Sequence, residues 1–329
     1  MQLIRLDDIE KTYESVYISP HFDDAAASCG GRIADQTRNG RHVLVVTVFS
    51  GLSGRKASRS ARRFTAEYPR RRLEDHAAMG TLGTDFLWLN YPDIVFRSGH
   101  PLFRYRPIYR PAPADKTMLP LIVSDLIGIC KKTACSQLLL PMGIGQHMDH
   151  QILFQAGMEL LNRRKPIADL IFYEDCPYML FPSMLFYRMK ITGLIHHLTS
   201  AGRRKINVCF TSGRKDAIAL LSGRPESDMK SLPLKLISFL FVSSFGPVTR
   251  HLIKTPPSLL QNHFLFCQHL DDITRRIDVK LNALLCYASQ LNRPVLQRHR
   301  IRNALAGYSA FLGAPANHFF ERYWKAVPV

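Results

Sequence analysis

Residues 16–24 read Val-Tyr-Ile-Ser-Pro-His-Phe-Asp-Asp and combine a structural signal with a chemical one. The run Val16–Ser19 is short, apolar and rich in β-branched residues, which is typical of a strand buried in a parallel sheet. Pro20 ends the run, and the small residues from 25 to 34 predict a helix that packs closely on that sheet. The stretch therefore predicts a strand, a tight turn and a helix.

The predicted turn carries a histidine and two carboxylates. In open α/β sheets ligands bind at the carboxyl ends of the strands, which is where this turn lies. His21 and Asp24 are three residues apart, so both side chains can reach one metal ion. Asp23 would then face the space in front of the ion. Taken alone, this pattern is more often a helix cap or a salt bridge.

A second group of candidate ligands follows another apolar strand run, 137–140. Residues 143–150 read Gly-Ile-Gly-Gln-His-Met-Asp-His, and they should lie at the same edge of the sheet. His147 and His150 are at positions i and i+3 near a helix start, so they share one face. One can bind a metal while the other points at a substrate. A His/Asp/His set with an open fourth position is what a catalytic zinc site requires.

Strand and helix patterns alternate over the first 175 residues, which predicts a Rossmann-like three-layer α/β sandwich with a mainly parallel sheet. Besides 16–19, strands are expected at 42–49, 85–89, 137–140 and 169–173.

Periodicity also predicts helices and loops. A helix is expected over 68–82, and its apolar stripe consists of Leu73, Ala77, Ala78 and Leu82. The basic stretch 55–63 has no period and is interpreted as a mobile loop. An amphipathic helix is expected over 271–290.

The chain divides into a core at 1–179, an inserted helical or irregular element at 180–265, and a helical segment at 266–329 that completes the same domain. The insertion is basic and apolar, and we place it on the substrate side. Its apolar stretches fit core helices, or a lid that contacts a lipid-like substrate.

Composition narrows the class of protein. The chain has 329 residues, of which 46% are hydrophobic and 21% charged, so it is not expected to be disordered. It has no uninterrupted run long enough to span a membrane and no signal-peptide pattern at its start. Its seven cysteines include no C-x-x-C pair, which favours reduced thiols and a cytoplasmic protein.

The net charge of +18 fits either a solvated basic surface or an anionic partner. Lys and Arg gather at 38–72, with ten against one acid, and at 181–254, with twelve against three. No nucleic-acid-binding signature accompanies them, so a nucleic-acid partner is not expected. Peripheral contact with a membrane stays open, and the sequence gives no indication of oligomeric state.

Together these motifs resemble the PIG-L/LmbE family of zinc-dependent N-deacetylases, whose signature is H-P-D-D-E after the first strand and H-x-D-H later. Here the first motif is His21-Phe22-Asp23-Asp24-Ala25, with Phe for Pro and Ala for Glu. Further segments are similar to the family pattern, namely Gly30-Gly31 with 42–49, Arg71–Asp75, Leu89–Asp93, Tyr173–Tyr178, Tyr287–Gln290 and Glu321–Trp324.

The resemblance implies an LmbE-like fold and a role for each candidate residue. It implies His21, Asp24 and His150 as zinc ligands, although other divalent transition metals suit such a site. It implies Asp23 as general base and His147 as the group that faces the developing oxyanion.

Three further residues keep two interpretations each. Arg71 is the candidate for holding substrate oxygens, with Arg72 an equal alternative. Asp93 lines the pocket or caps a turn. Asp149 orients a neighbouring histidine, or serves as an acidic residue at a helix N-terminus.

The predicted function is metal-dependent hydrolysis that removes an N-acetyl group from an N-acetylglucosamine-type sugar conjugate. The conjugate is a small molecule, and a phosphate-bearing or lipid-linked one would suit the basic clusters. The alternatives are a deacylase of a non-sugar amide, or a zinc-containing binding protein without turnover that docks to an anionic surface. The presence of both Asp23 and His147 argues against the binding protein, because a structural zinc site closes its fourth position with protein.

Overall fold

The computed structural model describes residues 1–52, 59–97, 115–163, 167–192, 264–291 and 294–328. Within them one sheet contains the strands β1 (Gln2–Leu3), β2 (Ser15–Ser19), β3 (Val43–Thr47), β4 (Asp85–Trp88), β5 (Gln137–Pro141), β6 (Asp169–Tyr173), β7 (Phe264–Asp272) and β8 (Phe320–Pro328). The described helices are α1 (Asp24–Arg38), α2 (Arg59–Leu82), α3 (Ile94–Arg97), α4 (Asp115–Thr133), α5 (Met148–Leu161), α6 (Pro182–Ile191), α10 (Ile277–Leu285) and α11 (Pro294–Phe311).

The strand order explains how the sheet makes a binding edge. The order is β1-β4-β3-β2-β5-β6-β8-β7, and every pair from β1 to β6 is parallel. The chain runs outward from β2 through β3 to β4, then returns to the other side of β2 to form β5 and β6. The β2–β5 boundary is therefore the point where the strand order reverses, and in such sheets ligands bind there. The predicted α/β class with a mainly parallel sheet is confirmed.

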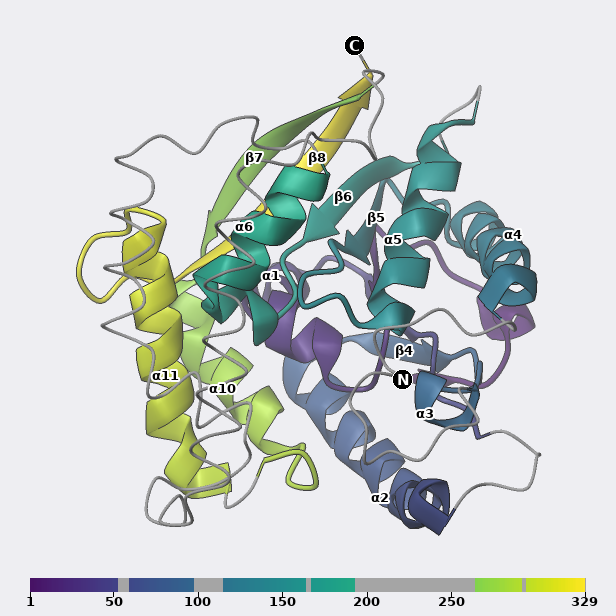
Figure 1. Cartoon of the computed structure of the whole chain (residues 1–329), viewed down its shortest axis with the longest axis horizontal. Helices are drawn as coiled ribbons and strands as arrows, with labels where there is room; N and C mark the ends of the chain where they lie inside the picture. The colour runs from purple at the N-terminus through teal and green to yellow at the C-terminus, as the bar shows by residue number, and fades with distance from the viewer. Residues whose placement is uncertain (53–58, 98–114, 164–166, 193–263, 292–293, 329) are drawn as a thin grey trace.

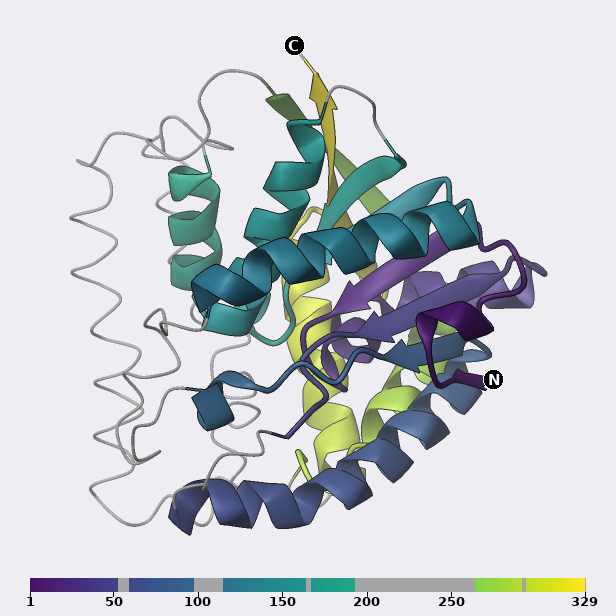
Figure 2. The same ribbon diagram turned by 90° about the vertical axis from the view of Figure 1, so that its right-hand side faces the viewer.

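Helices cover both faces of the sheet, as Figures 1 and 2 show. Successive side chains of a strand point to opposite faces, so each strand contributes to two cores. Val16 and Ile18 pack in a cluster with α4 and α5, whereas Tyr17 packs in a second cluster with α1, α2 and α10. All three side chains are fully buried. This double burial is why β2 has no polar face and reads as a continuous apolar run.

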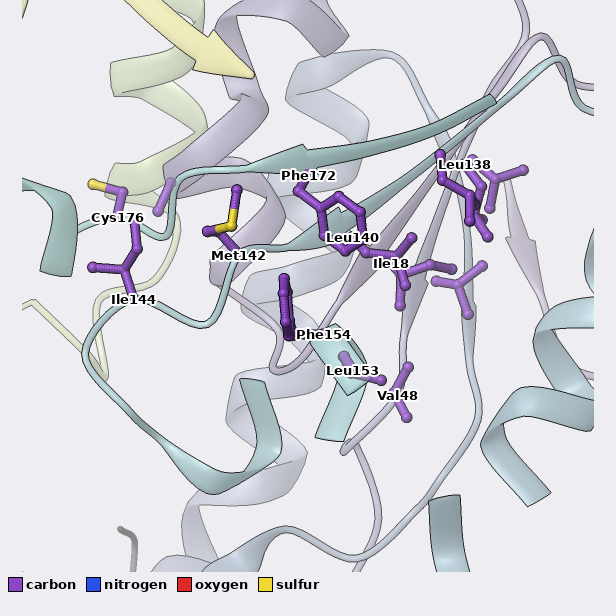
Figure 3. Packing of buried hydrophobic residues seen from close by; sticks show 14 of the residues in the cluster. Ile18, Val48, Leu138, Leu140, Met142, Ile144, Leu153, Phe154, Phe172 and Cys176 are labelled. Carbon is purple, nitrogen blue, oxygen red and sulfur yellow. The ribbon is translucent and has the colours of Figure 1, made fainter. Parts of the chain in front are cut away.

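The core on the α5 side is tightly interdigitated. Figure 3 shows Phe172 of β6 beside Leu140 of β5, with Phe154 of α5 nearby. The ring centroids of Phe154 and Phe172 are 5.2 Å apart, an ordinary distance for a packed aromatic pair. This packing fixes the start of α5 relative to the strand ends that carry the candidate ligands.

The five strands expected from the sequence are present at the expected places, but helix α2 differs from its prediction. It begins at Arg59, so the loop expected over 55–63 is wrong for 59–63, while 55–58 lie outside the described residues. Leu73 of the expected apolar stripe is 74% exposed. Ala77 is exposed as well, whereas Ala78 and Leu82 of the stripe are buried as expected. The buried face also carries the polar side chains of Tyr68, Arg71 and Asp75. Periodicity failed only in part, because α2 buries polar side chains next to the sheet edge that no apolar stripe can mark.

The C-terminal segment contains strands that the sequence pattern did not predict. The helix expected over 271–290 is shorter, because α10 covers only Ile277–Leu285 and residues 271 and 272 end β7. Strand β8 pairs antiparallel with β6, and β7 pairs antiparallel with β8. Most of the element expected at 180–265 lies outside the described residues. The proposed domain boundaries stay a prediction.

Glu321 of β8 ties the C-terminal segment to α1. One of its carboxylate oxygens accepts hydrogen bonds from Gly31 N at 2.9 Å and from Lys280 Nζ at 2.7 Å. The other accepts from Arg32 N at 3.0 Å. Lys280 and Glu321 are both buried, and a buried ion pair of this kind is stable only when its remaining hydrogen bonds are made. The C-terminal segment is thus built into the same core.

Every helix in the described ranges is too short or too polar to cross a lipid bilayer.

Replacing Gly31 by Ala should destabilise the fold. A Cβ atom at this position would lie 2.6 Å from the Ile273 side chain, which is closer than carbon atoms pack. We expect a loss of about 1–3 kcal/mol in the free energy of unfolding, measured by urea denaturation. Gly80→Ala is the matched control, because no atom lies within 4 Å of the place its methyl group would occupy and Ala favours helix by about 1 kcal/mol. Equal stability of the two variants would contradict this packing.

Candidate metal centre

The turn between β2 and α1 is held by its own polar groups. The Ser19 hydroxyl accepts a hydrogen bond from Ala25 N at 3.0 Å, and Asp24 Oδ2 accepts one from His21 N at 2.9 Å. Asp24 begins α1, where a carboxylate is favoured by the helix dipole. His21 Nδ1 lies 3.1 Å from the same Asp24 oxygen. The turn therefore presents one imidazole nitrogen and one carboxylate oxygen side by side.

The loop between β5 and α5 brings a second pair of histidines to the same edge. Gly143 and Gly145 have φ angles of +77° and +85°, and a Cβ at Gly145 would meet the Tyr178 ring at 2.4 Å. Only glycine fits so close an approach at such a φ. His147 caps α5, because its Nδ1 accepts a hydrogen bond from Asp149 N at 3.3 Å. His150 follows in the first turn of α5.

The three imidazole rings meet at the β2–β5 boundary. Ring centroids lie 4.9 Å apart for His21 and His147, 5.5 Å for His21 and His150, and 5.2 Å for His147 and His150. Nitrogen atoms of all three lie within 4.8 Å of one another. The predicted meeting of the two loops is therefore seen in the structure.

Two distances among the candidate ligand atoms are close to those of a tetrahedral metal site. His150 Nε2 lies 3.3 Å from Asp24 Oδ2, and His21 Nδ1 lies 3.1 Å from that oxygen. Bond lengths of zinc to nitrogen and oxygen ligands place neighbouring ligand atoms about 3.3–3.5 Å apart in a tetrahedral site. Both distances to Asp24 Oδ2 are thus close to the spacing that one ion would need.

Carboxylates hold the other nitrogen of each histidine. His21 Nε2 is 2.9 Å from Asp149 Oδ2, and His150 Nδ1 is 2.6 Å from Asp175 Oδ1. Metal-binding histidines usually donate their second N–H in this way, which fixes the ring and its tautomer. His21 also forms a ligand-like group with Asp93 and Asp149. Asp24 belongs neither to this group nor to that of the three histidines, so its place in the ligand set stays a prediction.

Burial and charge set the protonation of these groups. Burial lowers the pKa of His147 to about 3, with a further contribution from His21, so its imidazole is neutral. Burial also lowers the pKa of His150, but Asp24 and Asp175 outweigh it and raise the value to about 9. Burial opposes the ionised form of Asp24, yet His150 and His21 hold its pKa well below the usual range. Without an ion, the centre is therefore held together by a protonated His150 between Asp24 and Asp175.

Arg71, and not Arg72, lies beside the turn. Arg71 is buried and its Nη2 lies 3.8 Å from Asp23 Oδ1. Arg72 points elsewhere, since its Nη2 donates to Ser50 O at 3.2 Å and to Asn90 Oδ1 at 2.7 Å. Of the two arginines, Arg71 is thus the one beside Asp23, and which of them contacts a substrate stays a prediction.

Asp93 contacts both the start of α3 and His21, while its predicted place in a substrate pocket stays a prediction. Its Oδ1 accepts from Val95 N at 3.0 Å at the start of α3, and its Oδ2 lies 3.6 Å from His21 Nε2. Asp149 likewise stands in the first turn of α5 and contacts His21. Each of these two carboxylates therefore lies at the start of a helix and also contacts His21.

Sequence reasoning missed two supporting residues, Asp175 and Arg97. Asp175 follows β6, so its place after a parallel strand was a usable signal. It also accepts from Ile144 N at 2.8 Å, which anchors the β5–α5 loop. Arg97 donates to Asp149 Oδ1 at 2.7 Å, while Asp149 Oδ2 accepts from Ile94 N at 3.1 Å. No motif marks Arg97, which precedes a stretch of sequence rich in Arg and Pro.

A buried carboxyl group, Asp75, supports the same turn from α2. The Tyr287 hydroxyl lies 2.7 Å from both Phe22 O and Asp75 Oδ1, and Trp88 Nε1 donates to Asp75 Oδ2 at 2.7 Å. Burial raises the pKa of Asp75 to about 7, although the hydrogen bonds from Tyr287 and Trp88 favour the ionised form.

The sequence of this chain is similar to a protein family and to two deacetylases. Residues 16–161 match the family described as PIG-L: GlcNAc-PI de-N-acetylase, and that range contains every site residue singled out from the sequence. A 2'-N-acetylparomamine deacetylase of Niallia circulans is 27% identical over 191 residues, which cover 50% of this chain and 66% of that protein. The protein of the same description from Streptomyces fradiae is 28% identical over 170 residues, covering 50% and 57%. The match spans less than two thirds of either relative.

Solved structures share the fold over nearly the whole chain. A deacetylase of teicoplanin biosynthesis superposes with a TM-score of 0.62 at 19% identity, covering 96% of this chain and 98% of that one. The deacetylase of the A40926 pseudoaglycone superposes with a TM-score of 0.60 at 19% identity, covering 95% of this chain and 97% of that one.

Metal affinity should depend on His150 and, less strongly, on Asp175. We expect His150→Ala to bind no stoichiometric metal, because one of three donor atoms is lost. Asp175→Asn should weaken binding about 10–100-fold, since it only releases the ring of His150. Titration calorimetry with Zn²⁺ measures both. Asp169→Asn is the control, because Asp169 is exposed at the start of β6, the strand that precedes Asp175, and this variant should bind Zn²⁺ normally. Full metal content in His150→Ala would remove this residue from the ligand set.

Stability should depend on pH through Asp75. A carboxyl pKa raised from 3.8 to about 7 stabilises the folded state at low pH, and this contribution is lost as the pH rises from about 4 to 7. The slope is at most about 1.4 kcal/mol per pH unit. Asp75→Asn mimics the protonated side chain, so its unfolding free energy should vary less over this range. Urea unfolding with chelator present tests this, and identical pH profiles would show that Asp75 is ionised throughout.

Proposed function

We propose, from the premise that residues 16–161 form a PIG-L family domain, that this chain is a metal-dependent amidohydrolase that removes an N-acetyl group from an amino sugar conjugate. One observation carries the proposal. A single oxygen of Asp24 lies 3.1 Å from a nitrogen of His21 and 3.3 Å from a nitrogen of His150. The carboxylate of Asp23, the preceding residue, is more exposed than that of Asp24.

We assign His21, Asp24 and His150 as the residues that would hold the ion. Two imidazoles and one carboxylate suit zinc, and they also suit iron, cobalt or nickel. When bound, such an ion lowers the pKa of water toward about 7 and acts as a Lewis acid on a carbonyl group. Asp149 and Asp175 keep the two rings in place through the nitrogens that face away from Asp24.

Asp23 is the proposed general base. Its side chain is 34% exposed, so it is open to water and substrate, whereas its neighbour Asp24 is buried. Desolvation, followed by the nearby Asp24 carboxylate, raises the pKa of Asp23 above its usual value. A carboxylate with a raised pKa accepts a proton from attacking water more readily, and it can return that proton to the departing amine.

His147 is the proposed donor to the developing oxyanion. Its Nδ1 accepts from the Asp149 backbone, so the proton of the neutral ring is on Nε2. Its lowered pKa keeps the ring uncharged near neutral pH. A fixed N–H beside the reacting carbonyl stabilises negative charge that appears only in the transition state.

We infer an amino sugar as the substrate class. Arg71 offers a guanidinium that can hold two oxygen atoms, and Asp93 offers a carboxylate on the same side of the centre. The two curated relatives act, by their descriptions, on an N-acetylated paromamine. A phosphate-bearing or lipid-linked conjugate is part of the proposal, as is a cytoplasmic location.

Replacing Asp23 by Asn should abolish turnover without removing the metal. We expect acetate release from N-acetylglucosamine conjugates to fall at least about 100-fold, because the general base is lost, while metal content is unchanged. Enzymatic acetate detection and elemental analysis of the same sample give the two readouts. Asp35→Asn on the exposed side of α1 is the control and should keep full activity. Unchanged acetate release by the Asp23 variant would exclude Asp23 as base. If the wild-type protein released acetate only from amides without a sugar, the proposed amino sugar substrate would be wrong.

A further inference from the structure

Two buried polar atoms beside Asp23 have no hydrogen-bond partner within the described part of the chain. They are the Tyr68 hydroxyl oxygen and Arg71 Nε. Tyr68 and Arg71 are three residues apart on α2, so they share the face that meets the turn after β2. Both side chains are more than nine-tenths buried.

Aromatic packing fixes where the Tyr68 hydroxyl lies. The Tyr68 ring contacts Phe22 and Phe96 edge to face, with centroids 5.8 Å and 5.6 Å apart. Phe22 is next to Asp23, and Phe96 belongs to α3, which directly follows Asp93. Arg71 Cζ lies 5.8 Å from the centre of the Tyr68 ring and 5.6 Å from that of Phe22. The ring is thus clamped between the two strand ends that carry Asp23 and Asp93.

The hydroxyl is a neutral donor and acceptor. Burial, followed by the negative charge of Asp93, raises the pKa of Tyr68 well above its usual value, so it stays protonated. Leaving such a group unpaired in the interior opposes folding, and Phe would fill the same space without that cost. A tyrosine here is therefore explained by a partner that arrives from outside the fold.

We propose that Tyr68 is a specificity-determining residue whose hydroxyl binds a ring hydroxyl of the substrate, together with Arg71. This inference rests on the proposed function and adds a residue to it. The set contains one neutral hydroxyl, one guanidinium that only donates, and one carboxylate, Asp93, that only accepts. Such a set matches neighbouring hydroxyl groups of a sugar ring, since each of these both donates and accepts. An anionic group would instead be repelled by Asp93.

Tyr68→Phe tests this with opposite effects on stability and on activity. The variant keeps the ring contacts and removes only the unpaired hydroxyl, so its unfolding midpoint should stay the same or rise. Its kcat/KM for an N-acetylglucosamine conjugate should fall about 10-fold, mostly through KM, which is what one hydrogen bond contributes. Metal content should not change.

Tyr13→Phe is the matched control. The Tyr13 hydroxyl donates to Asp85 at 2.9 Å, and Asp85 begins β4 at the opposite end of the strands from the centre, so this variant should lose stability and keep its activity. If Tyr68→Phe loses stability as Tyr13→Phe does, the Tyr68 hydroxyl has a structural partner and the proposal is overturned. Unchanged kcat/KM would overturn it equally.

A binding measurement separates this inference from the proposed function. Calorimetry with glucosamine, the free amino sugar, compares wild type with Tyr68→Phe without any turnover. Weaker binding by the variant supports the role of Tyr68 even if wild type releases no acetate, a result that would exclude only the hydrolase. Equal affinity of the two proteins, alongside normal acetate release by wild type, would exclude only the role of Tyr68.

Discussion

The parallel pairing of β2 with β5 is the contact on which the candidate site depends. Their register aligns Ser15 with Gln137 and Tyr17 with Leu139, so both strands run the same way and end at the same edge. Two turns that are more than a hundred residues apart in the sequence are thereby placed next to each other. Since the strands are buried on both faces, a shift of register would turn every side chain to the wrong core. The hydrophobic effect thus indirectly fixes distances between polar atoms.

The centre concentrates charge that the fold alone does not neutralise. Asp24, Asp149 and Asp175 all contact its imidazoles, and each is largely removed from water. Arg97 offsets part of this charge from one side through Asp149. Buried carboxylates are tolerated only when they are paired, protonated or bound to a cation. The same arrangement that favours a metal therefore makes the unliganded protein depend on protonated histidines.

The parts of the structure that could be predicted from the sequence follow from local patterns. Buried parallel strands are continuous apolar runs, and the residues directly after them lie at the binding edge, so the strands and the positions of His21, Asp24 and His150 could be inferred. Strand β7 could not, because it is an edge strand with many exposed residues and weak alternation. The polar buried face of α2 was also missed. Periodicity placed Ala78 and Leu82 correctly in the apolar core, but it cannot mark polar side chains such as Arg71 and Asp75 that are buried next to the site, and it left Arg71 and Arg72 equivalent.

The contacts of Glu321 and Tyr287 show that the range that matches the family depends on residues outside it for its packing. Both residues lie beyond residue 161, yet they bind the backbone of α1 and of Phe22, next to the proposed base. A fragment trimmed to the matched range would retain every proposed ligand and lose the contacts that support them. Recognisable homology and cooperative folding therefore have different boundaries in this chain. A recombinant fragment whose ends are chosen from the homologous range would therefore not fold as cooperatively as the longer chain.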